Sequence, residues 1–511
     1  MNTPIYNKLL ALEEEQRIPF HMPGHKRRGS GRFREISGMD ITEITDYDNL
    51  HHPEGMIRES MDILKNIYGT RESWYLVNGS TVGVLAAISA CCRQGDGILI
   101  SRNCHKSVYN AIRILCLKTY YFEPRLSGQY QLFGEIGDEQ MERIRETLEK
   151  HPNIRAVVLP SPTYEGVVMD IARLKQTTER YDTVLIVDEA HGAHFPFHTY
   201  FPESAVKCGA DIVIQSTHKT LPAMTQTALL HLCSDKVSPE RITDMLSVYE
   251  SSSPSYVLMA SAEYSVAFMH ENAAKVQEYV DNLQNFRRKC EQLQCIHLIG
   301  REDLHCRDYD RGKLVFSVKN TDWNGIRLFD TLLQRYHVEL EMADHFHCIA
   351  MTSVCDSAKM YEVLWEALRE IDREIMKSMS DHKENLLKCE KSGHENDLLK
   401  CEKSGHENDL LKCTETAGKE LTFLPEKVME SWQCENLEKE TVRLEEAAGR
   451  VAGAYVMLYP PGIPVLVPGE KIMKETVENL RYYIYNGYNV LGLSGSDISV
   501  LKKCGGGKCL L

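Results

Sequence analysis

The stretches TVLIVDEAHGAHF (residues 183–195) and ADIVIQSTHK (residues 210–219) decide the fold of this chain. Each is a continuous apolar run of strand length that ends in polar residues, and helical patterns separate such runs from about residue 60 onward. Continuous apolar strands that alternate with helices indicate a mainly parallel sheet covered on both faces. The sequence therefore predicts an α/β fold. Because ligands bind beyond the carboxyl ends of the strands in such sheets, the polar residues after each run are the site candidates.

Size and charge limit the class of protein. The 511 residues exceed what one hydrophobic core usually serves, so we expect several domains. A net charge of −14 argues against general affinity for nucleic acid or for anionic membranes. No apolar stretch reaches the ~20 residues of a membrane helix, and the N-terminal helix has no signal-peptide pattern. The cysteines are scattered without metal-ligand spacing, so a reducing cytoplasm is the expected location.

Composition predicts six segments along the chain. They are an N-terminal helix and arm (1–58), a large domain (59–300), a small α/β domain (301–380), a repetitive linker insertion (381–420), a C-terminal domain (421–500) and a flexible tail (501–511). The linker repeats HKENLLKCEKSG with period 12, which aligns its His and Cys residues. These could bind a metal, but the Lys-rich and Glu-rich composition favours a duplicated solvated linker, and no metal site is expected.

Lys219 is the first candidate for chemistry, because it follows the apolar run ADIVIQ. A lysine at the end of a buried strand is partly desolvated, so that its amine can be neutral and nucleophilic, as a Schiff base with a carbonyl requires. The alternative is a lysine on a solvent-facing loop. Position alone does not decide between the two.

Asp188 ends the run TVLIVD and is expected near Lys219 at the same sheet edge. A carboxylate there could pair with the protonated pyridine nitrogen of pyridoxal phosphate (PLP) and keep the ring able to accept electrons. The alternative for Asp188 is a cap of the next helix. His191 would lie against the ring edge or the substrate, or else be a polar residue in a tight turn.

The stretch NGSTVGVLAAISA, residues 78–90, supplies an anion site. Ser80 and Thr81 open a helix, where hydroxyls and free backbone N–H groups can bind the cofactor phosphate. Serine and threonine are also the commonest helix caps, which is the alternative. His105 in SRNCHKS follows the next strand, and its imidazole could stack on the pyridine ring or be structural.

Together these motifs resemble those of the Orn/Lys/Arg decarboxylases, bacterial PLP enzymes of fold type I. The resemblance spans nearly the whole chain and rests on PFHMPGHKR, LVNGSTVG, RNCHKSVYNA, PSPTYEG, VDEAHGAHF, QSTHKTLPAMTQ and YPPGIPVLVPGE in this order. It implies decarboxylation of arginine, lysine or ornithine to the amine and CO2, as in polyamine metabolism. The chain is similar to the short form without an N-terminal wing domain, which implies a homodimer or homotetramer with the active site near the subunit interface.

The same resemblance implies residue roles. Lys219 carries the Schiff base, Asp188 pairs with the pyridine nitrogen, His105 stacks on the ring, Ser80, Thr81 and Ser216 bind phosphate, and His218 touches the phosphate or the reacting centre. His191 stands where the long forms carry a tryptophan, which bears on the substrate pocket. For a cationic substrate side chain the candidates are Glu470 and the acidic arm around Asp46 and Asp48. The alternative for each of these is an ordinary helix cap or surface charge.

Two other readings stay open. One is a different fold-type I reaction, transamination or β-elimination; an aminotransferase needs an arginine for the substrate α-carboxylate, and Arg450 is available. The other is a non-catalytic homologue with a binding or regulatory role, against which the intact Lys219, Asp188 and His105 argue. The sequence leaves the preferred basic amino acid and the role of the repeats undecided.

Overall fold

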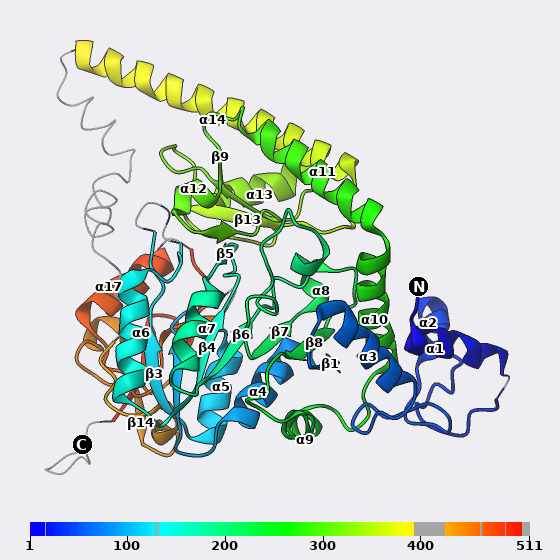
Figure 1. Cartoon of the computed structure of the whole chain (residues 1–511). Helices are drawn as coiled ribbons and strands as arrows, with labels where there is room; N and C mark the ends of the chain where they lie inside the picture. Colours follow the sequence, from blue (N-terminus) through cyan, green and yellow to red (C-terminus); the bar gives the residue numbers. More distant parts are fainter. Residues whose placement is uncertain are drawn as a thin grey trace, which may run out of the picture.

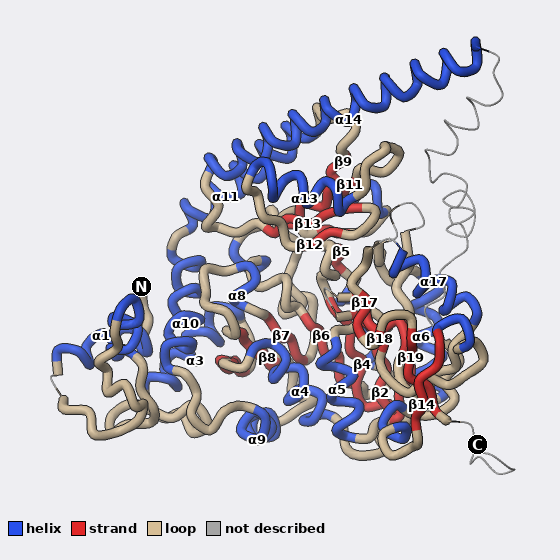
Figure 2. The backbone as a smooth tube through the Cα atoms, turned by 180° about the vertical axis from the view of Figure 1, so that it is seen from behind, coloured by secondary structure: helices blue, strands red, loops and turns tan. Residues whose placement is uncertain are grey.

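The computed structural model describes residues 1–15, 17–127, 130, 132–392, 425–459, 462–485 and 487–502. Most of the 12-residue repeats and of the predicted tail lies outside these residues. Three sheet-containing parts follow one another along the chain, and the N-terminal helices and the C-terminal part lie on opposite sides of the central sheet (Figures 1 and 2). Within the described residues no helix combines the length and the apolar character needed to span a bilayer.

A seven-stranded sheet in the order β1-β8-β7-β6-β4-β2-β3 is the centre of the large domain. Its strands are β1 (Glu72–Leu76), β2 (Gly97–Ser101), β3 (Lys118–Phe122), β4 (Ile154–Pro160), β6 (Val184–Asp188), β7 (Ile212–Gln215) and β8 (Ala228–Leu232). The predicted mainly parallel sheet is confirmed, and β8 alone runs antiparallel to its neighbours. The connection from β7 to β8 holds only the short helix α8 (Thr217–Thr220), which is too short for the crossover that a parallel pair needs.

Alternate residues of the central strands β6 and β7 enter two different hydrophobic cores. Ile186 and Ile214 pack into one core with the helices α1, α3, α4, α5, α9 and α10, whereas Leu185, Val187 and Val213 pack into the other with α6 and α7. The bounds of these helices are α1 (Pro4–Glu14), α3 (Met56–Tyr68), α4 (Gly79–Cys91), α5 (Lys106–Leu115), α6 (Asp138–Lys150), α7 (Ile171–Glu179), α9 (Pro239–Tyr249) and α10 (Tyr256–Glu271). Both faces are therefore buried, which explains the continuous apolar runs.

The N-terminal arm joins the large domain through a buried carboxylate. Glu263 on α10 accepts hydrogen bonds from the backbone N–H groups of Ile5 and Tyr6, at 3.1 and 2.8 Å, and so caps the start of α1. Between α1 and α3 the arm contains two short helices, η1 (Gly31–Phe33) and α2 (Arg34–Met39), and its other described residues lack regular structure.

The small domain is built on a four-stranded antiparallel sheet in the order β12-β13-β11-β9. Its elements are α11 (Ala273–Cys290), β9 (His297–Ile299), α12 (Arg301–Leu304), β11 (Lys313–Ser317), α13 (Gly325–Tyr336), β12 (Met342–Ala343), β13 (His347–Met351) and α14 (Ala358–Ser392). The helix α14 continues past residue 380, where the linker was predicted to begin, and projects from the body of the molecule (Figure 1). A short ladder between β5 (Val167–Val168) and β10 (Asp308–Tyr309) ties this domain to the large one.

The C-terminal part covers the free edge of strand β3. Its elements are η3 (Ser431–Cys434), β14 (Lys439–Arg443), η4 (Leu444–Glu446), β15 (Val456–Leu458), β16 (Ile463–Leu466), α17 (Lys474–Tyr485), β17 (Val490–Leu491), β18 (Leu493–Ser494) and β19 (Asp497–Leu501). Glu430 accepts from the backbone N–H of Thr119 at 3.1 Å, and Lys427 donates to the carbonyl of the same residue at 2.6 Å. The edge of β3 is thereby closed against pairing with another chain.

Candidate active site

The predicted residues come together at one edge of the central sheet. Asp188 is the last residue of β6, Lys219 follows β7 within α8, and His105 follows β2. Strands β1, β2, β6 and β7 run in the same direction, so their carboxyl ends share this edge. The start of α4, with Ser80 and Thr81, lies there too, because the backbone N–H of Gly79 donates to the carbonyl of Gln226 in the loop after α8.

Lys219 lies close to two carboxylates in a desolvated place. Burial lowers the pKa of its amine below the ordinary value, and the nearby negative charges of Asp188 and Glu341 oppose this shift without cancelling it. Asp188 itself is buried, with 8% of its surface exposed, and its Oδ1 accepts the backbone N–H of Ala190 at 3.2 Å. A lysine with a lowered pKa and a fixed carboxylate are thus present where the sequence predicted a nucleophile and its partner, and those two roles stay a prediction.

His191 joins Lys219 to a second lysine that the sequence analysis missed. Its Nε2 lies 3.0 Å from the Nζ of Lys219, and its Nδ1 lies 2.8 Å from the Nζ of Lys313, the first residue of β11. Lys313 is 1% exposed, and burial lowers its pKa to about 8. Burial and then the charges of Lys313 and Lys219 hold the pKa of His191 well below its ordinary value, so the imidazole is neutral.

Hydrogen-bond counting restricts the protonation of this trio. A neutral imidazole has one N–H donor and one acceptor nitrogen, whereas an ammonium group can only donate. The two lysines therefore cannot both be ammonium ions while both bond to His191, and one of them is a neutral amine. A Lys313 ammonium, whose Nζ also lies 5.6 Å from the centre of the Tyr164 ring, leaves Lys219 neutral and accepting from Nε2–H. A neutral Lys313, which its pKa of about 8 favours, leaves the positive charge on Lys219 beside Asp188.

The phosphate-binding candidates surround a hydroxyl that lacks a partner. The Oγ of Ser216 is buried, and neither it nor the Oγ1 of Thr220 has a hydrogen-bond partner among the described residues. Asn78 precedes α4 without capping it, so the first N–H groups of that helix have no side-chain acceptor. A phosphate oxygen would satisfy both kinds of donor. The residues present therefore fit the phosphate of PLP, for which they were predicted.

Both of the other predicted histidines have fixed rings. His218 Nδ1 donates to the carbonyl of Thr227 at 2.7 Å. His105 caps α5, since its Nδ1 accepts the backbone N–H of Ser107 at 3.2 Å. Burial lowers the pKa of both histidines, and Asp188 opposes the shift at His105. His105 therefore fills the structural role given as its alternative while it also lies at the sheet edge, within reach of solvent.

The two predicted substrate carboxylates are engaged elsewhere. Glu470 is 1% exposed, and its Oε2 accepts from Arg102 at 2.9 Å and from the backbone N–H of Val467 at 2.7 Å. Asp48 accepts the backbone N–H groups of Gly55 and Ile57 at 2.9 and 2.8 Å, which makes it the cap of α3, its stated alternative. No described hydrogen bond or ion pair joins either residue to Lys219.

Two further residues lie at the site without having been predicted. Tyr164, from the motif PSPTYEG, packs edge-on against the His191 ring at 5.0 Å and donates to Glu341 at 2.5 Å. Glu341 is exposed, and its charge raises the pKa of both Lys219 and Lys313. The signal for Tyr164 was present in its motif, but Glu341 and Lys313 are brought in by the small domain, which no local pattern reveals.

Arg450, the residue that kept transamination open, does not face this site. Its Nη2 donates to the carbonyl of Leu501 at 2.8 Å and pairs with Glu440, both within the C-terminal part. Arg450 therefore has a structural role in the C-terminal part, and its presence no longer favours an aminotransferase.

Comparison with known proteins identifies the family. The family model described as Orn/Lys/Arg decarboxylase, major domain, matches residues 3–330, and the model of the C-terminal domain matches residues 412–486. An arginine decarboxylase of Bacillus subtilis is 29% identical over 511 residues, which cover 98% of this chain and 96% of that protein. The constitutive lysine decarboxylase of Escherichia coli is 24% identical and covers 93% of this chain and 76% of its own.

The solved structures agree with this assignment at the level of the fold. A structure of the Escherichia coli constitutive lysine decarboxylase has a TM-score of 0.79 at 20% identity, covering 98% of this chain and 82% of that one. A lysine decarboxylase of Pseudomonas aeruginosa gives a TM-score of 0.80 at 20% identity, with 98% and 80% covered. The protein is therefore an amino-acid decarboxylase of PLP fold type I and belongs to the Orn/Lys/Arg decarboxylase family.

Proposed function

We propose that this enzyme binds PLP through Lys219 and decarboxylates arginine in preference to lysine or ornithine, supplying an amine for polyamine synthesis. The observation that carries the proposal is the Lys219 amine, 3.0 Å from a neutral His191 and close to the buried Asp188. Arginine is chosen because the Bacillus and Halalkalibacterium relatives named for it match 91–98% of the chain at 27–29% identity, against 24% for the constitutive lysine decarboxylase of Escherichia coli.

Each residue of the site has a task that its contacts support. When bound, PLP supplies an electron-accepting ring for the electrons released as CO2 departs. Asp188 would hold a proton on the ring nitrogen, and Ser216 with the first N–H groups of α4 would hold the phosphate. His105 lies at the same edge, where it would cover the ring face.

The trio of Lys219, His191 and Lys313 handles protons. With Lys313 charged, Nδ1 of His191 accepts and Nε2–H donates, so Lys219 keeps the lone pair that attack on a carbonyl requires. Once free of the cofactor, Lys219 would take up the proton that the substrate ammonium gives up, and the resulting ammonium beside Nε2 would deliver that proton to the carbon from which CO2 departs. Positioning is the larger contribution, because well-oriented groups avoid the entropy cost of meeting.

Glu341 is the proposed contact for the cationic end of the substrate. It is exposed, its carboxylate is oriented by the Tyr164 hydroxyl, and it lies within electrostatic reach of Lys219. A carboxylate accepts a guanidinium through two parallel hydrogen bonds, which suits arginine. Glu470 and Asp48 are second choices, since Arg102 and the start of α3 already use their oxygens.

We also propose that the enzyme is a homodimer or homotetramer. The N-terminal arm carries apolar side chains that are largely exposed in the single chain, namely Ile18 at 76%, Phe20 at 93%, Met22 at 67% and Phe33 at 70%. Apolar side chains gathered in this way are typical of a surface that another subunit covers.

A substrate panel tests the reaction. Purified enzyme with PLP is incubated with arginine, lysine or ornithine, and CO2 and the amine product are measured. Arginine should give the highest kcat/KM, and no CO2 from any of the three would refute the proposal. Lys219→Ala should abolish both CO2 release and the visible absorption of bound PLP, whereas Lys359→Ala, on the exposed start of α14, should change neither.

A further inference from the structure

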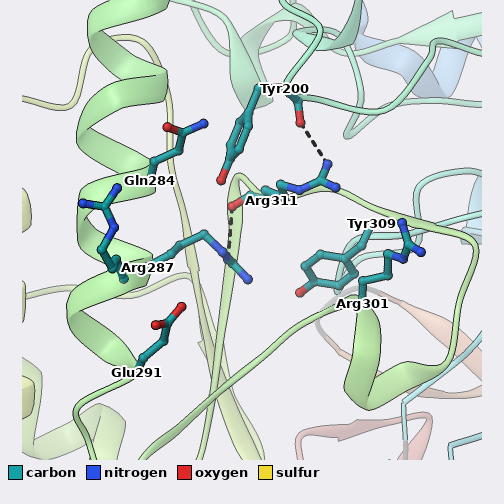
Figure 3. A pocket seen from close by; sticks show the side chains of 8 residues that line it. Tyr200, Gln284, Arg287, Glu291, Arg301, Tyr309 and Arg311 are labelled. Atoms are coloured by element: carbon teal, nitrogen blue, oxygen red, sulfur yellow. Dashed lines mark hydrogen bonds between the residues drawn. The ribbon is translucent and has the colours of Figure 1, made fainter.

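A cavity lies where the small domain meets the loop that contains Tyr200. It has a volume of about 330 Å³ and lies between α11 and the segment from α12 to β11. Its lining includes Tyr200, Arg287, Arg288, Arg301, Tyr309 and Arg311 (Figure 3). None of these residues belongs to the active site described above, and none of them takes part in the chemistry proposed for it.

The cavity concentrates positive charge in an acidic protein. Four guanidinium groups line it, and Glu291 is the single carboxylate among the lining residues, although the whole chain carries a net charge of −14. Arg301 lies 3.7 Å from Glu302 and Arg311 lies 3.9 Å from Asp308, whereas within the described residues no carboxylate oxygen approaches Arg287 or Arg288 to within 4.0 Å. Two of the four charges therefore lack an internal counter-ion, which is typical of an anion site.

The inner wall offers donors that the protein does not use. Tyr309 is 1% exposed, and its buried hydroxyl has no hydrogen-bond partner among the described residues. Figure 3 shows the guanidinium of Arg287 between the hydroxyls of Tyr200 and Tyr309. Burial raises the pKa of both tyrosines, and the charge of the nearby Arg287 guanidinium opposes this rise at each.

Backbone carbonyls fix the two central arginines in place. Arg287 Nη1 donates to the carbonyls of Arg311 and Lys313 at 3.2 and 3.3 Å, and Arg311 Nη1 donates to the carbonyl of Tyr200 at 2.9 Å. The remaining nitrogens of Arg287 make no hydrogen bond to the described residues. A guanidinium that is oriented before the ligand arrives loses less entropy on binding.

We propose that this cavity binds a small anion that bears a diphosphate group. Planar guanidinium forks converge here from α11, from α12 and from the segment before β11, and such forks bind phosphate oxygens bidentately from several directions. The unpartnered Tyr309 hydroxyl adds a neutral donor at the inner end. Inorganic diphosphate and the diphosphate of a nucleotide share this chemistry, and the cavity volume admits either.

Binding here would reach the active site through Lys313. Arg287 Nη1 donates to the backbone carbonyl of Lys313 at 3.3 Å, and the Nζ of Lys313 lies 2.8 Å from the Nδ1 of His191. An anion that draws Arg287 toward itself weakens that hold and so changes the position of the Lys313 ammonium. This regulatory consequence rests on the proposed function, whereas the binding itself does not.

Calorimetry on the PLP-loaded enzyme tests the site with two probes, sodium pyrophosphate and adenosine diphosphate. Both should bind, and Arg288→Gln should weaken binding at least tenfold, with several-fold weakening by Tyr309→Phe. Arg173→Gln, an exposed arginine on α7, is the matched control and should bind like the wild type. If both probes bind with equal affinity, the site recognises the diphosphate alone. If adenosine diphosphate binds more tightly, the site also contacts the nucleoside. Both outcomes support the site.

The proposal fails if neither probe binds at millimolar concentration, or if Arg288→Gln and Arg173→Gln bind alike. The visible absorption of PLP is followed in the same titrations. If the probe abolishes that absorption and binds Arg288→Gln as tightly as the wild type, it occupies the cofactor phosphate site. That result would overturn the proposal. Because decarboxylation is measured separately, failure of the anion site leaves the proposed function standing.

Discussion

Replacing Lys313 tests whether its charge keeps Lys219 in the neutral form. The two lysines contact opposite nitrogens of one imidazole at 3.0 and 2.8 Å, so their ammonium groups lie at most about 8 Å apart. At an effective dielectric constant of about 20, two unit charges at that distance repel by about 2 kcal/mol. That energy corresponds to about 1.5 pKa units. We therefore expect Lys313→Met to raise the pKa of Lys219 by about 1.5 units.

The assay follows formation of the Schiff base rather than turnover. Apoenzyme is mixed with PLP over a range of pH, and the growth of visible absorption is recorded by stopped flow. Since the neutral amine is the reacting species, the midpoint pH should rise by about 1.5 units in Lys313→Met, and the rate well below the midpoint should fall about 30-fold. Lys359→Gln, which removes an exposed lysine, should leave the profile unchanged.

Lys313→Gln separates the effect of charge from the effect of the hydrogen bond. Glutamine can still donate to Nδ1 of His191 but carries no charge. If repulsion dominates, Gln and Met shift the midpoint equally, whereas a shift in Met alone assigns the effect to the imidazole tautomer. An unchanged midpoint in both variants would falsify the role given to Lys313.

Three further predictions follow from buried groups. Lys313 has a folded-state pKa of about 8 against an ordinary 10.5, so its buried charge costs up to about 3 kcal/mol below pH 8. The cost fades as pH rises from 8 toward 10.5. The free energy of unfolding, measured in urea, should therefore rise by about 2 kcal/mol more in wild type than in Lys313→Met between pH 7 and 9.5, and equal slopes would contradict this. Ser216→Ala should weaken PLP binding by about 10–100-fold in an absorbance titration. The melting temperature of its apoenzyme should not fall, because the lost hydroxyl has no described partner. Arg102→Met should destabilise the protein by about 3–5 kcal/mol, since it leaves Glu470 buried without its counter-ion, and adding Glu470→Met should recover part of the loss.

Local patterns predicted the parts of the site that depend on one strand and the turn after it. Asp188 and Lys219 could be placed because each ends a buried apolar run, and parallel strands bring their carboxyl ends to one edge. The same logic placed His105 and the start of α4. The orientation of β8 was not predicted, because its apolar run is the same in a parallel or an antiparallel strand.

Local sequence patterns could not predict contacts between segments that are distant in the sequence. Lys313 is the first residue of an ordinary-looking strand, and its place at His191 depends on a contact across 122 residues. Glu470 was predicted to contact the substrate because no local pattern reveals its ion pair with Arg102, which lies 368 residues away. Asp48 shows the opposite case, since a local helix-cap pattern was available and proved sufficient to account for its contacts.

The pair of Arg102 and Glu470 also bears on how the protein is made. During synthesis Arg102 leaves the ribosome long before its partner, as does strand β3 before Lys427 and Glu430 can cover its edge. Until then the large domain carries a charge without its counter-ion and an open strand edge, which invites pairing with other chains. The contacts that pair Arg102 and cover the edge of β3 therefore form only after translation has passed residue 470.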